Sequence, residues 1–183
     1  MVTELYKFII HPKKYIKAEI NTIPTQLTLT GILLYAVSQG MAFSLTPSLN
    51  NIIFLSITYL LLNGIAMIFS VSFIDFFAQL TNCKAQSKKL FFWMFTPYIF
   101  SALFIPVQLL TPIWSGLLSL LIAWVLIGTI ISLQLFIISQ LYSISSFKSI
   151  LLYMSPILVI LSILLISLFV IGKTIINFMS YIF

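Results

Sequence analysis

Residues that could carry acid–base, metal or redox chemistry are few in this chain and lie far apart. There is one histidine, His11, and one cysteine, Cys83, which are too few ligands for a usual zinc or haem site. The carboxylates are Glu4, Glu19 and Asp75, and they form no pair spaced for acid–base catalysis. No glycine-rich phosphate loop or nucleophile elbow occurs in the sequence. The residues therefore predict a protein that is not an enzyme, with no catalytic residue, metal or cofactor assigned.

The composition excludes most soluble classes. Hydrophobic residues make up 61% of the 183 positions and charged residues only 7%, against about 25% charged in an ordinary soluble domain. A soluble domain of this size could not remove that much apolar surface from water. We therefore expect an integral membrane protein rather than a soluble enzyme, a nucleic-acid-binding domain or a disordered chain.

Long uncharged stretches define the elements that must carry the few polar side chains. No charged residue occurs between Glu19 and Asp75, or between Lys89 and Lys148, and a bilayer core takes about 20 helical residues per span. A turn-forming cluster at 46–51 divides the first stretch, and Thr111-Pro112 divides the second. The runs are continuously apolar rather than alternating, which favours helices over strands.

The sequence thus predicts an all-α, polytopic membrane helical bundle with five transmembrane helices. Residues 1–24 form a cytoplasmic juxtamembrane segment, and residues 25–183 form the membrane domain. The predicted spans lie at about 25–45, 52–73, 90–110, 113–138 and 150–171.

The lysines predict the orientation. Eight of the nine basic residues, all lysines, fall before the first span or in the loops after the second and fourth spans, and only Lys173 falls on the opposite side. The positive-inside rule then places the N-terminus in the cytoplasm and the C-terminus outside. The absence of arginine resembles an AT-rich coding bias, and we expect a bacterial inner (cytoplasmic) membrane.

The same lysines are the candidate contact surfaces. From Pro12 onward the N-terminal segment has its isoleucines on one helical face, as in a short helix lying among lipid headgroups. The alternative is a solvated tail. Clustered lysines beside apolar spans favour anionic headgroups as partners, and no nucleic acid is expected. The candidate lipid or partner contacts are Lys13, Lys14, Lys17, Lys84, Lys88 and Lys89.

Two prolines occupy equivalent positions in two similar segments of the chain. Residues 89–97 align with residues 148–156, each beginning at a lysine and reaching a hydroxyl–proline pair eight residues later. Pro97 and Pro156 each remove a backbone donor and are predicted to kink spans three and five, which would line one side of the bundle. The similarity of the two segments indicates a repeat of two hairpins; the alternative is a chance match, which arises easily in apolar sequence.

Polar residues inside the spans are expected to join helices. One face of span one, which we expect to pack inside the bundle, carries Thr28, Gly31, Tyr35, Ser38 and Ala42. Asn63 is the candidate intramembrane polar contact: a hydrogen bond to a neighbouring helix is the first interpretation, and a substrate or ion contact is the alternative. Asp75 is interpreted first as a boundary residue that could pair with a loop lysine.

Three segments resemble the Ypt/Rab-interacting protein (Yip domain) family. Residues 8–15, Phe-Ile-Ile-His-Pro-Lys-Lys-Tyr, are similar to the proline segment before the first span of bacterial members. Residues 89–106 resemble the family's third span, and residues 141–156, with Ser-Ser-Phe-Lys at 145–148, resemble its last loop and span. In place of the glycines usual in the second loop, this chain has Asn-Cys-Lys-Ala-Gln at 82–86.

The resemblance implies a five-span, non-enzymatic protein of the bacterial branch. Eukaryotic relatives are linked to Rab-type GTPases and carry a longer cytosolic N-terminal region, so Rab binding is not carried over to this chain. We expect a membrane organiser or an accessory subunit of a larger complex, since some bacterial relatives work beside ABC-type exporters. The partners would be membrane lipids and other membrane proteins, with the oligomeric state open. A passive permease or small-molecule transport component is the alternative, and a membrane-embedded enzyme is the third.

Overall fold

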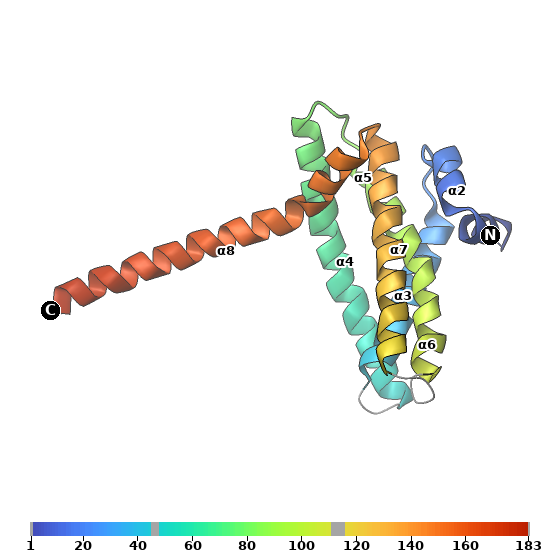
Figure 1. The fold of residues 1–183 in the computed structure, drawn as a ribbon, viewed down its shortest axis with the longest axis horizontal. Helices are drawn as coiled ribbons and strands as arrows, with labels where there is room; N and C mark the ends of the chain where they lie inside the picture. The colour runs from blue at the N-terminus through green and yellow to red at the C-terminus, as the bar shows by residue number, and fades with distance from the viewer. Residues whose placement is uncertain (1, 45–47, 111–115, 183) are drawn as a thin grey trace.

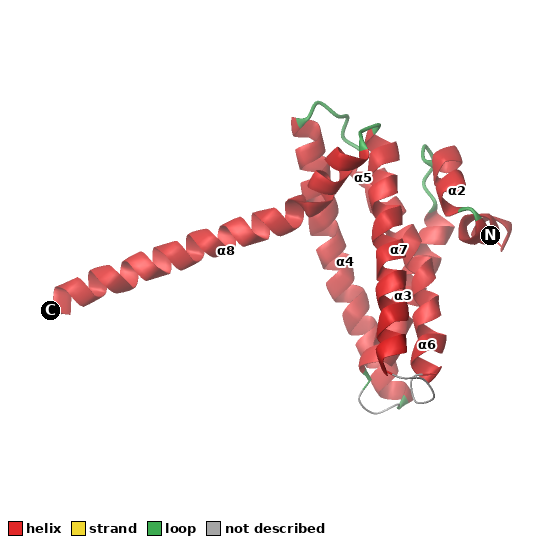
Figure 2. Ribbon diagram, in the orientation of Figure 1, coloured by secondary structure: helices red, strands yellow, loops and turns green. Residues whose placement is uncertain are grey.

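The computed structural model describes residues 2–44, 48–110 and 116–182, and all regular secondary structure within them is helical (Figure 2). The elements are α1 (Val2–Ile10), α2 (Pro12–Glu19), α3 (Thr25–Phe43), α4 (Leu49–Leu80), α5 (Ser87–Phe95), the 3-10 helix η1 (Thr96–Leu103), α6 (Phe104–Leu110), α7 (Gly116–Tyr142) and α8 (Ser146–Ile182). Helices α3, α4, α6 and α7 run side by side, while α8 points away from them (Figure 1).

Four helical stretches in the described residues are long and apolar enough to cross a membrane. They are α4, the continuous α5–η1–α6 stretch Ser87–Leu110, α7, and α8 as far as Ile175. Their outward faces are Leu, Ile and Phe, which lipid tails can cover. The chain is therefore an all-helical integral membrane protein. Helix α3, in the predicted span 25–45, contains 19 residues and is less apolar because it carries several Thr and Gln side chains.

The polar face of α3 packs inside the bundle, as predicted. Thr28 and Ser38 are each 1% exposed, and the Thr28 hydroxyl donates to the backbone oxygen of Phe92 at 2.9 Å. Gly31 faces the backbone of α5, where an added Cβ would lie 2.4 Å from the oxygen of Phe95. Only glycine allows α3 to approach α5 and η1 this closely.

The first predicted turn is shorter than expected. Helix α4 begins at Leu49, so Asn50 and Asn51 are helical rather than part of a turn. The Ser48 hydroxyl accepts a hydrogen bond from the Asn51 N–H at 3.3 Å and caps the helix, which explains the early start. The rest of that turn, and the break at Thr111-Pro112, lie outside the described residues.

The helix changes character at Pro97. Helix α5 ends at Phe95, and η1 carries the chain from Thr96 to Leu103 before α6 begins. Proline has no N–H to donate to the backbone oxygen four residues earlier, which is that of Trp93. The Thr96 hydroxyl donates to this oxygen instead, at 2.8 Å. The predicted span 90–110 is thus an α-helix, a tight 3-10 segment and a second short α-helix in line.

Helix α8 packs against the bundle only at its beginning. Ser149, Leu152 and Ser155 are buried, whereas nearly every described side chain from Ile157 to Ile175 is exposed. Figure 1 shows this part of α8 leaving the other helices. The prediction that span five lines one side of the bundle is therefore wrong beyond Pro156. The physical reason is that residues 157–171 are apolar except for Ser162 and Ser167. Both hydroxyls donate to carbonyls of their own helix, so no polar side chain holds this part of α8 against another helix.

The two predicted hairpins end their first helices in the same way. Asn82 after α4 and Ser143 after α7 both have positive φ, 63° and 53°. The next residue in each loop donates its N–H back to a helix carbonyl, Cys83 to Ala78 and Ile144 to Ser139, both at 3.1 Å. This is the Schellman arrangement of a helix C-terminus. Because a third to a half of helices end in this way, the repeat stays a prediction.

Candidate functional site

The N-terminal segment forms a helical hairpin that docks onto the membrane domain. Helices α1 and α2 each insert one fully buried side chain, Phe8 and Ile16, both 0% exposed. Phe8 packs on Phe100 of η1 with ring centroids 5.9 Å apart. The Trp93 indole N–H donates to the backbone oxygen of Thr22 at 3.0 Å and fixes the chain after α2. The helix predicted from Pro12 is present, and it is held on the bundle rather than left free as a solvated tail.

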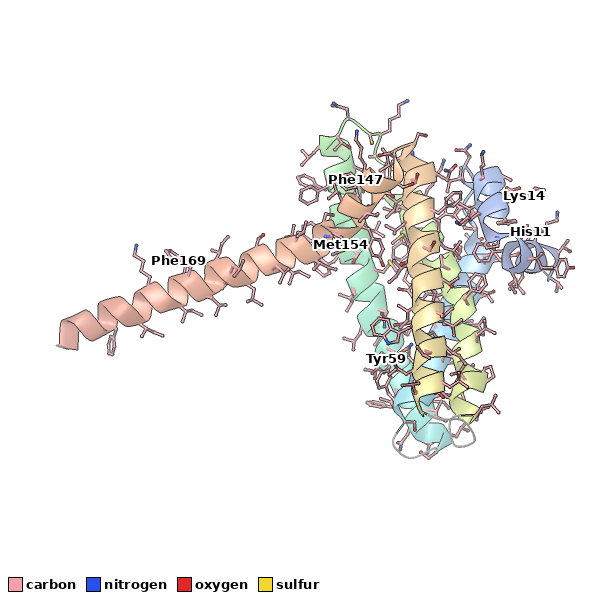
Figure 3. The ribbon with its side chains drawn as sticks, viewed as in Figure 1. His11, Lys14, Tyr59, Phe147, Met154 and Phe169 are labelled. Atoms are coloured by element: carbon pink, nitrogen blue, oxygen red, sulfur yellow. The ribbon has the colours of Figure 1, made fainter. Side chains whose placement is uncertain are left out.

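The α2 lysines lie at the outer surface of this hairpin. Lys13, Lys14 and Lys17 are exposed, and Figure 3 shows Lys14 and His11 on the side of the molecule where the hairpin docks. The ammonium group of Lys13 lies 5.8 Å from the ring centroid of Phe136 on α7. A cation over an aromatic face is stabilised by the ring quadrupole, so this lysine is directed at the membrane domain.

Grooves connect the lysines of α2 to α7 and α8. A cavity of about 620 Å³ lies between the start of α2 and the middle of α7, and Lys13 and Lys14 line it. A smaller cavity of about 220 Å³ is also lined by Lys13. Its other polar lining residues are Ser132, Ser139, Ser146 and Ser149. Ser139 and Ser149 already donate to the backbone oxygens of Ile144 and Ser146. Lys13, with the exposed hydroxyls of Ser132 and Ser146, is suited to hold a phosphate oxygen.

A third cavity separates α1 from α2 and carries charges of both signs. It measures about 550 Å³, and Glu4, Lys7, Lys14 and Glu19 line it. Tyr15 lies in the same cavity, and burial raises its pKa, helped by the negative charges of Glu4 and Glu19. The phenol is therefore held in its neutral form beside Trp93, whose ring centroid is 6.4 Å from that of Tyr15.

The loop lysines lie apart from those of α2. Lys84 and Lys88 are exposed and Lys89 is half-buried, on the loop after α4 and the first turn of α5. The cavities lined by Lys13 are not lined by any of these three residues. The structure therefore presents two separate basic surfaces instead of one.

Asp75 anchors the loop between α4 and α5, a role that sequence reasoning missed. The side chain is 4% exposed and accepts hydrogen bonds from the Gln86 backbone N–H at 2.8 Å and from the Tyr142 hydroxyl. Gln79 donates a third at 3.0 Å. The expected pairing with a loop lysine is replaced by these neutral donors, which satisfy the carboxylate in place of water.

Asn63 joins two helices. The Tyr35 hydroxyl on α3 donates to Asn63 Oδ1 on α4 at 3.2 Å, and Asn63 Nδ2 donates to the backbone oxygen of Tyr59 at 2.9 Å. This is the interhelical hydrogen bond that the sequence favoured over a substrate contact.

Gln134 is the buried polar centre of the bundle and was not singled out from the sequence. It is 2% exposed, donates to the oxygen of Met94 at 3.1 Å, and accepts from the Tyr153 hydroxyl at 2.9 Å. Two cavities of about 440 and 160 Å³ meet at Gln134, Tyr98 and Tyr153. An amide in the middle of an uncharged span was the available signal, but only the fold shows what it touches.

Potential metal ligands do not gather anywhere in residues 2–44, 48–110 and 116–182, where no group of three His, Cys, Asp or Glu side chains lies together. The polar groups that the structure does bring together are hydroxyls, amides and lysines. These groups can hold headgroups or neutral polar molecules by hydrogen bonding and charge.

Comparison with known proteins adds no relative to this description. No protein-family model, no curated protein and no solved structure matches the chain.

Proposed function

We propose that this chain is a five-span, non-enzymatic membrane protein of the Yip type, which acts as a membrane organiser or as an accessory subunit of a larger complex. The observation that carries the proposal is the docked hairpin. Phe8 and Ile16 fix it to the bundle, and this fixes Lys13 in a groove against α7. A basic surface in a fixed orientation can recognise anionic headgroups or an acidic partner surface.

The proposed topology counts α3 as the fifth span. At about 1.5 Å per residue, its 19 residues extend about 28 Å, close to the thickness of a bilayer core. Its most extensive packing is with α4 and η1, and both belong to stretches apolar enough to span. The lysine distribution then puts the N-terminus in the cytoplasm, the C-terminus outside, and the protein in a bacterial inner membrane.

Anionic lipid is the proposed ligand of the hairpin. Each lysine near an anionic surface contributes about 1 kcal/mol to membrane association, and α2 presents Lys13, Lys14 and Lys17 together. In the cavity beside Lys13, the hydroxyls of Ser132 and Ser146 add donors for one phosphate. The loop lysines Lys84, Lys88 and Lys89 form the second proposed surface.

Partner proteins are proposed to bind the membrane-exposed helices. The apolar part of α8 beyond Pro156 protrudes from the bundle (Figure 1), and in Figure 3 Phe169 marks this part. The resemblance to bacterial Yip proteins suggests an ABC-type exporter as the larger complex. The chain would then be a scaffold, with no reaction of its own.

Reconstitution tests the lipid surface directly. The protein is incorporated into nanodiscs of phosphatidylcholine, and exchange-competent phosphatidylglycerol is titrated in. The triple variant K13Q/K14Q/K17Q is expected to lose enrichment of phosphatidylglycerol around the protein, and K84Q/K88Q/K89Q is expected to lose part of it. The control is Lys173→Gln, which removes one lysine from the protruding part of α8.

The outcomes separate lipid binding from partner binding. Purification from cells in mild detergent, run with the same variants, measures the proteins that co-purify. Unchanged phosphatidylglycerol enrichment together with unchanged co-purification would reject both lysine surfaces. Loss of co-purification alone would assign them to a protein partner.

A passive permease is the second candidate, and the cavities that meet at Gln134 favour it. A tightly packed layer on the side of the lysine loops counts against it. The fully buried side chains of this layer are Leu90, Trp93, Ile137 and Ile138. Release of small neutral solutes from proteoliposomes at a rate above that of protein-free vesicles would favour the permease over the organiser.

A further inference from the structure

The larger of the two cavities at Gln134 has the character of a binding site. It measures about 440 Å³ and reaches from Gln134 in the middle of α7 to Ala123, eleven residues earlier, which is about 16 Å along the helix. Near the other end it is lined by Gln39 on α3 and Gln108 on α6. These two residues lie close to the ends of their helices, away from the lysine-bearing loops.

Two amides in this cavity lack protein partners. Within the described residues, the side chains of Gln39 and Gln108 make no hydrogen bond with another protein group. Both side chains are half-buried, and wherever such an amide is in contact with hydrocarbon it needs a polar partner, because no water is present there. Other polar side chains of the bundle, such as Asn63 and Gln134, do have partners. The amides of Gln39 and Gln108 are therefore open to hydrogen bonds from a polar molecule in this cavity.

The lining selects the chemistry of that molecule. The cavity is lined by amides and by the aromatic rings of Tyr35, Tyr98 and Tyr153, and none of the described residues that line it is charged. Amides donate and accept hydrogen bonds, and flat rings pack on apolar C–H surfaces. An anion or a cation would be left without a counter-charge in low dielectric. A neutral molecule with several hydroxyl groups, such as a sugar, satisfies both kinds of contact.

The rim of the cavity indicates how this molecule is carried. Phe43, Ile127 and Ile131 line the cavity and are also exposed on the surface of the bundle. These side chains continue into apolar helix surface that faces lipid. We propose that the cavity binds the neutral, hydroxyl-rich headgroup of a lipid, with the headgroup against the glutamines and the hydrocarbon chains over the isoleucines. This site is separate from the lysine surfaces proposed above.

Lipid retention tests the proposal. The full chain is purified in a polyoxyethylene detergent, which has no sugar headgroup, and is incubated separately with monoglucosyl diacylglycerol, diacylglycerol and phosphatidic acid. Native mass spectrometry then measures bound lipid. We expect preferential retention of the glucolipid. The double variant Q39L/Q108L removes both free amides and should retain it at least tenfold less, since it loses two hydrogen bonds to the headgroup.

Control variants separate binding from folding. Gln26→Leu makes the same change on α3 at an exposed position and should bind normally. Ala123→Phe fills the cavity without removing an amide and should also abolish retention. The Q39L/Q108L protein should melt no lower than the wild type, because the lost amides had no protein partner. The triple lysine variant should bind the glucolipid normally, so failure of one proposal is distinguishable from failure of the other.

Three results would overturn the proposal. One is equal retention of the glucolipid and diacylglycerol by the wild type. Another is unchanged retention by both Q39L/Q108L and Ala123→Phe. The third is displacement of the glucolipid by methyl glucoside at equal concentration, which would show a site for free sugar instead of a lipid headgroup.

Discussion

The contact between α3 and α5 offers a sharp test of the packing, through Gly31. A methyl group added at Gly31 would lie 2.4 Å from the backbone oxygen of Phe95 and 3.5 Å from the backbone nitrogen of Ile99. Since the nearest atom to the added methyl group belongs to the backbone, no side-chain rotation relieves the clash. The two helices would have to separate by about 1 Å to restore an ordinary van der Waals contact. The change Gly31→Ala is therefore expected to destabilise the protein by about 1–3 kcal/mol, the usual cost of overpacking.

Gly64 on α4 provides a matched control. A methyl group there would meet no atom within 4 Å, so Gly64→Ala should stabilise the helix by about 0.5–1 kcal/mol, because alanine loses less backbone entropy than glycine on folding. The two variants make the same chemical change and should shift stability in opposite directions, with a difference of about 1.5–4 kcal/mol.

Thermal unfolding in nanodiscs measures this difference. We expect a lower melting temperature for Gly31→Ala than for the wild type, and an equal or higher one for Gly64→Ala. The separation should also move Tyr35, one helical turn after Gly31, away from Tyr98, whose ring centroid lies 4.5 Å from that of Tyr35. If Gly31→Ala proved as stable as Gly64→Ala, the close approach of α3 to α5 and η1 would be wrong.

Three further predictions follow from other contacts. Asp75→Asn should loosen the loop after α4, because an amide offers one acceptor oxygen where the carboxylate uses two. Faster trypsin cleavage at Lys84 would show the loosening, and unchanged cleavage would exclude the anchoring role of Asp75. Burial is the main cause that raises the pKa of Tyr15 above 10.0, so docking of the hairpin should be complete below pH 10 and be lost as the pH rises through the raised pKa. Trp93 fluorescence should report this loss, and fluorescence that stays constant up to pH 12 would contradict it. An impermeant maleimide should label Cys83, the one cysteine, only after cells are permeabilised, and labelling of intact cells would reverse the proposed topology.

Apolar composition determined much of the architecture from sequence alone. Long uncharged runs leave the helix as the form that satisfies every backbone hydrogen bond inside a membrane, so the helical class and the approximate positions of α3 to α8 could be predicted. The buried face of α3 was also predictable, since small and hydroxyl residues recur there at helical spacing. The N-terminal helix from Pro12 was predicted from its isoleucines.

Local hydrogen bonds determined the element ends, and the sequence described these less well. The start of α4 at Leu49 depends on the Ser48 cap, and the change of helix type at Pro97 depends on the missing proline donor and on the hydrogen bond from the Thr96 hydroxyl to Trp93. The departure of α8 after Pro156 could not be predicted, because a predominantly apolar helix is equally compatible with lipid and with neighbouring helices.

Long-range contacts were decided only by the tertiary structure. The three donors to Asp75 come from α4, from the following loop and from the end of α7, and the partners of Gln134 come from α5 and α8. Hydropathy records how apolar a segment is, but it does not record which side chains of separate helices meet. The chain by itself determined that these residues lie in a membrane, and the packing of the helices decided which of them line a cavity, since that depends on helix rotation and depth.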